Sequence, residues 1–225
     1  MTHAFNIEPV CSRQGETAIL CELGTLPGPT DLELQRRVWG MAAALSSHDD
    51  VLEVVPGMNN LLVIYREPQR DFAACEARIR EVWKSADTHR DNGREIVVPV
   101  VYGGPEGMDL NYVAEHCGLT REDYIGLHAE STYVVYALGS QPGFAYLGGL
   151  DPRLAVPRRD TPRPRVNAGS VIIGGAQAGV LSRTSPSGWH IIGTTALNCF
   201  DHTRATPALF APGDRVRFEV QAVRA

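Results

Sequence analysis

The chain has 225 residues, of which 44% are hydrophobic and 21% charged, which is the composition of a globular protein and not of a disordered one. Its formal net charge of -5 argues against a nucleic-acid-binding surface. No apolar run approaches the ~20 residues of a membrane helix, and the N-terminus lacks the pattern of a signal peptide, so no membrane association is expected.

Sequence patterns for metal and nucleotide binding are missing. The five cysteines are scattered without a C-x-x-C pair, which is typical of reduced thiols in a cytoplasm. There is no H-E-x-x-H motif or close His/Cys cluster, so no metal site is expected. Neither a G-x-x-x-x-G-K-S/T loop nor a G-x-G-x-x-G motif following a strand is present, so the chain has no known phosphate loop. We expect a cytoplasmic protein without a nucleotide-binding loop of its own.

The first 92 residues alternate short β-rich runs with amphipathic helices. The predicted elements are a strand at 17–23, a helix from the N-cap residues Thr30 and Asp31 to about 45, strands at 51–55 and 60–65 joined by a hairpin, a helix at about 69–86, and a strand at 95–102. This order predicts a ferredoxin-like α+β sandwich. The polar stretch 87–94 is the predicted linker between domains 1–92 and 93–225, and the strand at 95–102 fits either domain.

Two short helices and then a β-rich region follow. A helix at 109–117 ends at Gly118, and a second begins at Thr120, with Asp123 three residues later, in a pattern close to a capping box. Two helices packing beside a sheet are a better interpretation than a DNA-binding motif. From Ser131 onward, short strands alternate with turn residues, which predicts a small closed or partly closed β-barrel.

The glycine-rich stretch 139–149 is the first candidate for a binding site. It contains four glycines, Pro142 and the rings of Phe144 and Tyr146, more than an ordinary turn needs. This pattern predicts a loop that presents backbone amides to a ligand, with a long crossover of the barrel as the alternative. Ser140 lies in no G-x-S-x-G elbow, which excludes that type of serine hydrolase.

An arginine-rich segment at 151–165 is the second candidate. It carries five arginines, among them Arg158 and Arg163, and four prolines that keep the backbone extended. Guanidinium groups on a stiff segment suit the recognition of a carboxylate or a phosphate. The alternative is a solvated basic face or a strip of salt bridges to another protein chain.

Small hydroxyl residues and histidines form the third candidate. Ser170 follows a glycine and could donate a hydrogen bond to a carbonyl oxygen or an oxyanion. Trp189 and His190 are adjacent, so one of them should point into the core if they lie on a strand. His128, near Glu130, is at least as good a candidate as His190 for proton transfer.

Several of these stretches resemble one known family. The matching segments are VYGG at 101–104, DLNYVAEHCGL at 109–119, PGFAYLGGL at 142–150, PRRDTPRPR at 157–165, AGSV at 168–171, GW at 188–189 and GDRVRF at 213–218. In this order and spacing the chain resembles the family of the 5-oxoprolinase B subunit, also called the KipI or allophanate hydrolase subunit 1 family. The similarity covers nearly the whole chain.

The resemblance implies a fold and an activity. It implies an α+β N-terminal domain followed by a cyclophilin-like β-barrel. It also implies a protein that is inactive alone and that works with a C-subunit homologue and an A subunit in an ATP-dependent complex, which opens the lactam 5-oxoproline or a related amide. The alternatives that it leaves open are a KipI-like inhibitor of a histidine kinase and a component like the carboxyltransferase of urea carboxylase.

The sequence departs from the family pattern at five positions. Ser140 stands where a Phe is usual, Asn167 for Pro, Leu181 for Tyr, Ser187 for Gly and Thr194 for Arg. The changes remove a guanidinium and a phenol hydroxyl that could hold an anion or a lactam. They imply a different amide or lactam substrate, or a paralogue with altered activity.

Within the region 139–195 and the helix before it, ten residues are the predicted site. His128 and Ser170 are the catalytic candidates. The substrate-binding candidates are Pro142, Gly143, Phe144, Tyr146, Arg158, Arg163, Gln177 and Trp189. In this hypothesis the arginines bind anionic groups, the amides of the loop bind a carbonyl, and His128 transfers a proton or contacts a partner.

Overall fold

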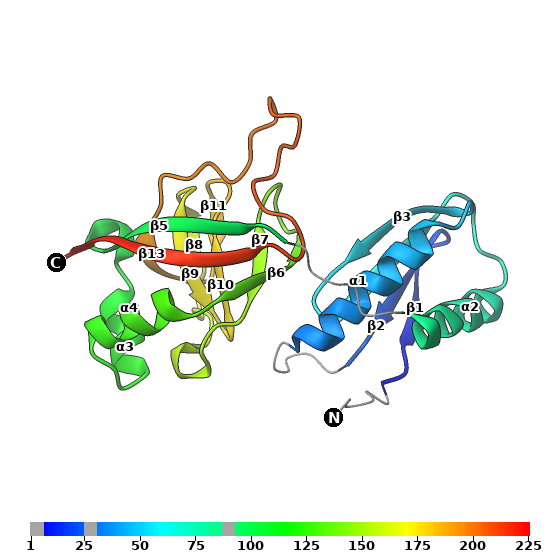
Figure 1. Ribbon diagram of the computed structural model, residues 1–225, viewed down its shortest axis with the longest axis horizontal. Coiled ribbons are helices and arrows are strands. Elements are labelled where there is room, and N and C mark those ends of the chain that lie inside the picture. Colours follow the sequence, from blue (N-terminus) through cyan, green and yellow to red (C-terminus); the bar gives the residue numbers. More distant parts are fainter. Residues whose placement is uncertain (1–6, 25–30, 87–92) are drawn as a thin grey trace. The chain divides into compact units, whose positions relative to one another are not determined.

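A computed structural model describes residues 7–24, 31–86 and 93–225. The chain divides into two compact units, residues 1–91 and residues 92–225, and each is described by itself (Figure 1). The predicted cap residue Thr30 and most of the predicted linker at 87–94 lie outside the described residues. No helix in the described parts of the chain is long and apolar enough to cross a membrane.

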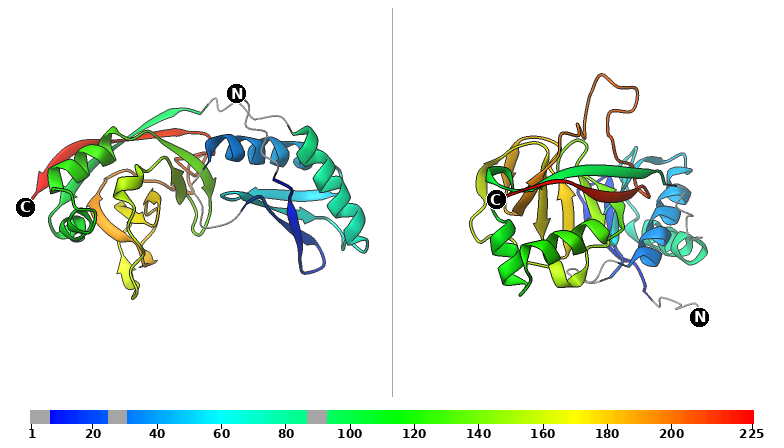
Figure 2. Two further views of the ribbon diagram at one scale, coloured as in Figure 1. Left: turned by 90° about the horizontal axis from the view of Figure 1, so that it is seen from below. Right: turned by 60° about the vertical axis from the view of Figure 1, so that its left-hand side comes forward.

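The N-terminal unit is an antiparallel sheet with two helices. Its elements are β1 (Val10–Gln14), β2 (Ala18–Glu22), α1 (Leu32–Ser46), β3 (Val51–Pro56), β4 (Asn60–Tyr65) and α2 (Phe72–Ser85). The strand order is β1-β2-β4-β3. Alternate residues of β4, Leu61, Val63 and Tyr65, are buried with Val38 of α1 and Ile79 of α2. The two helices therefore cover one face of the sheet, and Figure 2 shows α1 lying along it.

The ferredoxin-like interpretation of this unit is not confirmed. The strand β5 (Glu95–Gly103), expected as its last strand, pairs with strands of the second unit. The strand β1, which the sequence analysis missed, pairs instead with β2 at the edge of the sheet. The order in this unit is therefore strand, strand, helix, strand, strand, helix. The hairpin between β3 and β4 is present as predicted.

Carboxylate caps define where the helices of this unit begin. The side chain of Asp31 accepts hydrogen bonds from the backbone N–H groups of Glu33 and Leu34, at 2.8 and 3.2 Å. Asp71 accepts one from Ala74 in the same way at the start of α2. These bonds pair amide groups that the first turn of a helix leaves without a partner.

The C-terminal unit is built on a closed barrel, as the pattern of short strands predicted. Its described strands are β5, β6 (Tyr133–Leu138), β7 (Ala145–Gly148), β9 (Ser170–Gly174), β10 (Gln177–Val180), β12 (His190–Thr194) and β13 (Arg215–Arg224). They close in the order β10-β7-β6-β13-β5-β12-β9. Two short strands outside the barrel, β8 (Arg163–Val166) and β11 (Ser185–Ser187), pair with each other.

The parallel pair of β5 and β13 joins the start of this unit to its end. The register runs from Arg215 opposite Glu95 to Arg224 opposite Gly103, and Figure 1 shows the two strands side by side. Asp214, directly before β13, is buried, and its carboxylate accepts hydrogen bonds from the backbone N–H and the side chain of Arg94. This ion pair fixes the register where the two strands begin.

Two helices, α3 (Leu110–His116) and α4 (Arg121–Glu130), pack against the barrel. Val113, Tyr124 and Ile125 from these helices join Val98 and Phe218 from the barrel in one hydrophobic core. The predicted helix ends are present: Gly118 has a φ of +68°, and the hydroxyl of Thr120 accepts a hydrogen bond from the amide of Asp123 at 3.0 Å. The helices serve packing in this fold.

The cap at Asp31 gives a test of the N-terminal unit. We expect Asp31→Ala to lower the free energy of unfolding of this unit by about 1 kcal/mol, because two amides lose their acceptor. Urea unfolding followed by the fluorescence of Trp39 and Trp83, in a Trp189→Phe background, measures this value. Asp49→Ala, at an exposed position, is the control and should change it little. Equal effects of the two variants would contradict the assignment of the cap.

Candidate functional site

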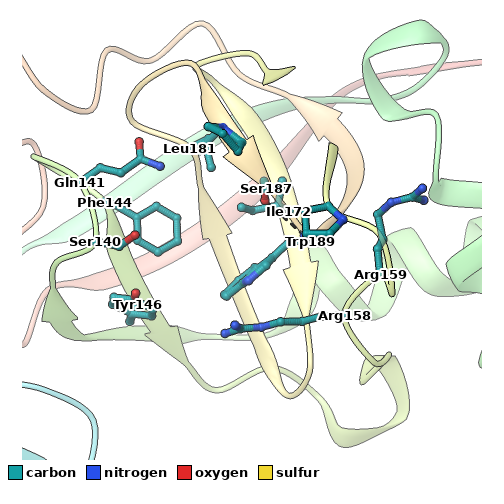
Figure 3. A pocket seen from close by; sticks show the side chains of 13 residues that line it. Ser140, Gln141, Phe144, Tyr146, Arg158, Arg159, Ile172, Leu181, Ser187 and Trp189 are labelled. Atoms are coloured by element: carbon teal, nitrogen blue, oxygen red, sulfur yellow. Dashed lines mark hydrogen bonds between the residues drawn. The ribbon is translucent and has the colours of Figure 1, made fainter. Parts of the chain in front are cut away.

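A cavity of about 290 Å³ lies in the C-terminal unit, on the face of β9 that points away from the barrel core. Val171 and Ile173 point into that core, whereas Ile172 between them belongs to a second cluster with Phe144 and Trp189. Figure 3 shows the side chains around this cavity. Its lining residues are Ser140, Gln141, Phe144, Tyr146, Arg158, Arg159, Pro162, Ile172, Leu181, Pro186, Ser187, Gly188 and Trp189. We call this cavity the outer pocket.

The aromatic rings in the outer pocket pack edge to face. The ring of Phe144 lies 5.0 Å from that of Tyr146 and 6.0 Å from that of Trp189, both in T-shaped geometry. Trp189 also lies directly over Gly174, where an added Cβ would come within 2.6 Å of the indole. A glycine is therefore required under the indole. The result is a largely apolar wall with fixed ring orientations, of the kind found in small-molecule sites.

The loop from Gly139 to Phe144 brings polar groups to the same pocket. Ser140 has a φ of +63°, an uncommon conformation for a residue other than glycine. Gly143 has a φ of +75°, and a Cβ there would lie 2.7 Å from the carbonyl oxygen of Cys199. Pro142 and Gly143 thus shape the turn without lining the pocket, whereas Ser140 and Phe144 line it.

Gln141 presents an unpaired hydrogen-bond acceptor. Its Nε2 donates to the hydroxyl of Ser185 at 2.7 Å. Its Oε1 is buried and has no hydrogen-bond partner among the described residues. A buried amide oxygen without a donor is costly, and a ligand N–H group would satisfy it. Gln141 lies in the predicted loop but was not predicted as a site residue, because a sequence does not show which atom of an amide is left unpaired.

The arginines of the segment 151–165 have different roles. Arg158 is exposed, and its guanidinium carbon lies 5.3 Å from the centre of the Trp189 ring, at the outer pocket. Arg163 does not line the pocket. Its guanidinium donates two hydrogen bonds to the carboxylate of Asp109, at 2.8 and 2.7 Å. The anion paired with Arg163 in this structure is therefore Asp109, and the binding of an anionic substrate by Arg163 stays a prediction.

Asp109 connects three parts of the unit. Its carboxylate, only 7% exposed, also accepts a hydrogen bond from the backbone N–H of Ile191 at 2.8 Å. The backbone N–H of Asp109 in turn donates to the carbonyl of Ile191 at 2.9 Å. A second cation, Arg159, lies 3.7 Å from the same carboxylate. This network fixes the arginine-rich segment against the start of α3 and against β12.

The pocket lining leaves out two other predicted residues. Ser170 is buried at the start of β9, where it pairs with Thr194 of β12. Gln177 begins β10 and is partly exposed. Neither side chain lines the outer pocket.

His128, the predicted proton-transfer residue, lies in the hydrophobic core. It is fully buried and its ring is 4.4 Å from that of Phe218. Its Nδ1 is 2.8 Å from the hydroxyl of Tyr102, and its Nε2 has no hydrogen-bond partner among the described residues. Burial lowers the pKa of His128 to about 3. The ring is therefore neutral at physiological pH and inaccessible to a substrate or a partner, which removes His128 from the candidate site.

The neutral ring of His128 predicts acid sensitivity. Its folded pKa lies below the unfolded value of about 6.5, so its contribution is complete above pH 6.5 and is lost as pH falls toward 3. Between pH 7.5 and 5 we expect the free energy of unfolding to fall by roughly 2 kcal/mol through this residue. Urea unfolding across this range should show a flatter pH profile for His128→Phe. The control His202→Phe, at an exposed position, should keep the wild-type dependence of unfolding free energy on pH. A dependence in His128→Phe as steep as in the wild type would contradict this assignment.

The role of Arg163 can be measured through stability. Removing it leaves the buried Asp109 carboxylate with one backbone donor and the distant Arg159. We expect Arg163→Ala to lower the free energy of unfolding by roughly 3 kcal/mol. Arg165→Ala, on the same strand at an exposed position, is the matched control and should cost less than about 0.5 kcal/mol. A stable Arg163→Ala protein would contradict this structural role.

Family comparisons agree with the fold and with the resemblance. The family model described as "Carboxyltransferase domain, subdomain C and D" matches residues 9–210. Over 211 residues the chain is 45% identical to the 5-oxoprolinase B subunit of Escherichia coli O157:H7, covering 94% of this chain and 95% of that protein. The chain belongs to the carboxyltransferase-domain family that includes the 5-oxoprolinase B subunit.

Solved structures share the fold. The crystal structure of TTHA0988 is similar with a TM-score of 0.74 at 35% identity, and the match covers 92% of this chain but 40% of that one. The urea amidolyase of K. lactis is similar with a TM-score of 0.81 at 18% identity, over 98% of this chain and 15% of that one. In both proteins the matched region is part of a much longer chain.

Three of the five departures from the family pattern meet in the outer pocket. Ser140, Leu181 and Ser187 all line it. These substitutions are spread over 48 positions of the chain, so the sequence does not show that they share a site. Arg159 and Ile172 line the pocket too, although neither was predicted as a site residue. The alternation along the buried run 171–173 is the signal that could have identified Ile172.

Proposed function

We propose that this chain is the B subunit of a 5-oxoprolinase-type complex and that its outer pocket binds a small lactam bearing a carboxylate. The observation that carries the proposal is that Gln141, whose Oε1 is buried and unpaired among the described residues, lines the same pocket as Arg158. The family gives the class of reaction, because relatives of this chain are named as B subunits of 5-oxoprolinase. The pocket supports the class of ligand.

The chemical groups of such a ligand match those of the pocket. 5-Oxoproline is a compact ring with an N–H donor, a carbonyl oxygen and a carboxylate. In the proposed pose its N–H donates to Oε1 of Gln141, and its carboxylate pairs with the guanidinium of Arg158 or Arg159. The ring lies against the indole of Trp189. The cavity of about 290 Å³ is at the small end of ligand pockets, which suits a ligand of this size.

In this proposal the outer pocket binds the substrate but does not supply all of the catalytic groups. Its described lining has serine hydroxyls, the phenol of Tyr146, an amide and two guanidinium groups, and no carboxylate, imidazole or thiol side chain to act as a general base. The remaining groups would come from a C-subunit homologue and an A subunit, and the chain would be inactive alone. ATP is used by the complex, and we assign its binding to the other subunits because this sequence has no known phosphate loop.

The departures from the family pattern act on substrate choice in this proposal. Ser140 and Ser187 place small hydroxyl groups at the pocket, and Leu181 places an alkyl group where the family has a phenol. A hydroxyl can donate to the lactam carbonyl, and an alkyl group cannot. We therefore infer a lactam related to 5-oxoproline but not restricted to it.

Kinetics of the assembled complex test the proposal. We expect Gln141→Leu and Arg158→Ala each to raise KM for 5-oxoproline or its analogue about 10- to 100-fold, because each removes one partner of a polar group on the ligand. Arg215→Ala, at an exposed position on β13, is the matched control and should leave KM unchanged. Activity is measured as lactam-dependent ATP hydrolysis by the chain co-expressed with its C and A partners.

Two results would contradict this function. One is an assembled complex that turns over no lactam among a panel of ring sizes. The other is unchanged kinetics in Gln141→Leu and Arg158→Ala while assembly is intact, which would place the ligand elsewhere. Size-exclusion chromatography of each complex separates loss of binding from loss of assembly.

A further inference from the structure

A second cavity of about 320 Å³ lies next to the outer pocket in the C-terminal unit. It is lined by Tyr112, Arg159, Asp160, Thr161 and His190. Arg159 lines both cavities, so the two cavities share one residue. We call this cavity the charged pocket, because it carries a cation, an anion and an imidazole. Nothing in the proposed function above uses Tyr112, Asp160 or His190.

His190 presents a buried acceptor without a donor. The ring is 3% exposed, and its Nε2 lies 2.9 Å from the carbonyl oxygen of Pro157. A carbonyl oxygen only accepts, so Nε2 carries the hydrogen, and in the neutral ring Nδ1 is an acceptor. That Nδ1 has no hydrogen-bond partner among the described residues. A ligand with an N–H group would supply the missing donor.

Tyr112 covers this imidazole from the solvent side. Its ring stacks on that of His190 with centroids 5.1 Å apart and an angle of 24° between the planes. Tyr112 itself is 53% exposed on the helix α3. Tyr112 and His190 both line the charged pocket. The face of the Tyr112 ring can attract a cationic group there.

The charges of the pocket are of opposite sign. Arg159 has a long contact of 3.7 Å with Asp109, which is already paired with Arg163, and its Nε has no partner among the described residues. Asp160, next along the chain, is exposed and lines the same cavity. A simple anion would meet the carboxylate of Asp160, and a simple cation would meet the guanidinium of Arg159. A ligand carrying both charges suits both groups.

We propose that the charged pocket binds a zwitterionic α-amino acid. Its carboxylate pairs with Arg159 and the hydroxyl of Thr161, and its ammonium group pairs with Asp160 and donates to Nδ1 of His190. This inference deepens the proposed function and rests on it, because a ring-opened lactam has these groups. Hydrolysis breaks the C–N bond of the lactam, and one water supplies the second oxygen of the new carboxylate and the two hydrogens that convert the lactam N–H into an ammonium group. Arg159 then lies within reach of both the substrate and the product.

Calorimetric titration of the isolated chain with four probes tests the proposal. L-Glutamate has both charges, glutarate lacks the ammonium group, inorganic phosphate is a simple anion, and 5-oxoproline is the probe of the outer pocket. We expect glutamate to bind at least 10-fold more tightly than glutarate or phosphate. Asp160→Asn should lower the affinity for glutamate about 10-fold and change the affinity for 5-oxoproline less than twofold. Arg158→Ala should lower the affinity for 5-oxoproline about 10-fold and change the affinity for glutamate less than twofold. Glu122→Gln, an exposed acid on α4, is the control and should change neither.

The outcomes separate the two proposals. One outcome is that glutamate binds in a manner that depends on Asp160 while 5-oxoproline does not bind. This outcome would support the charged pocket as an amino-acid site and would count against the lactam site in the outer pocket. Binding of 5-oxoproline with no binding of glutamate would overturn the inference alone. Glutarate binding as tightly as glutamate, or an Asp160→Asn variant with unchanged glutamate affinity, would also overturn it.

Discussion

The ion pair between Asp109 and Arg163 is the interaction on which the candidate site depends. A nearly buried carboxylate is costly unless its oxygens are paired, and here the guanidinium fork of Arg163 and the backbone N–H of Ile191 pair both of them. The pair holds the proline-rich segment against the barrel. That segment carries Arg158 and Arg159, so the same bonds that stabilise it also place these two guanidinium groups at the pockets.

The two faces of the strand β9 carry side chains with different roles. Side chains on the inner face of β9 fill the barrel, and Ile172 on the outer face joins the aromatic cluster of the outer pocket. The barrel interior holds His128 as a neutral ring among aromatic residues, where it can take no part in proton transfer with a ligand. The proposed functional groups therefore lie outside the barrel, on the loop 139–144 and the segment 157–163, which a rigid sheet supports.

Local patterns in the sequence predicted local structure well. The cap at Asp31, the hairpin between β3 and β4 and the glycine at 118 each depend on neighbours within a few residues, and the structure shows all three. Phe144, Tyr146, Arg158 and Trp189 were predicted as site residues and lie together in the outer pocket, although their role in binding stays a prediction.

Long-range partners could not be predicted from the same patterns. The partner of β5 is a strand 120 positions later, and the anion of Arg163 is 54 positions earlier. An arginine beside prolines looks the same whether its carboxylate belongs to a substrate or to the protein. Likewise, the sequence does not show whether a histidine near the end of a helix points to the solvent or into the core. The ferredoxin-like interpretation was not confirmed for this reason, since it needed β5 in the first sheet.

The proposed binding of a lactam in the outer pocket against Trp189 can be measured directly. The chain has three tryptophans, and Trp39 and Trp83 are buried in the N-terminal unit, where they act as internal references. An NMR titration of the ¹⁵N-labelled chain with 5-oxoproline follows the three indole N–H signals, assigned through Trp189→Phe. We expect the Trp189 signal to shift in a saturable manner while the other two signals stay in place. A saturable shift of another indole, or a Trp189 signal that does not move at saturating ligand, would contradict it.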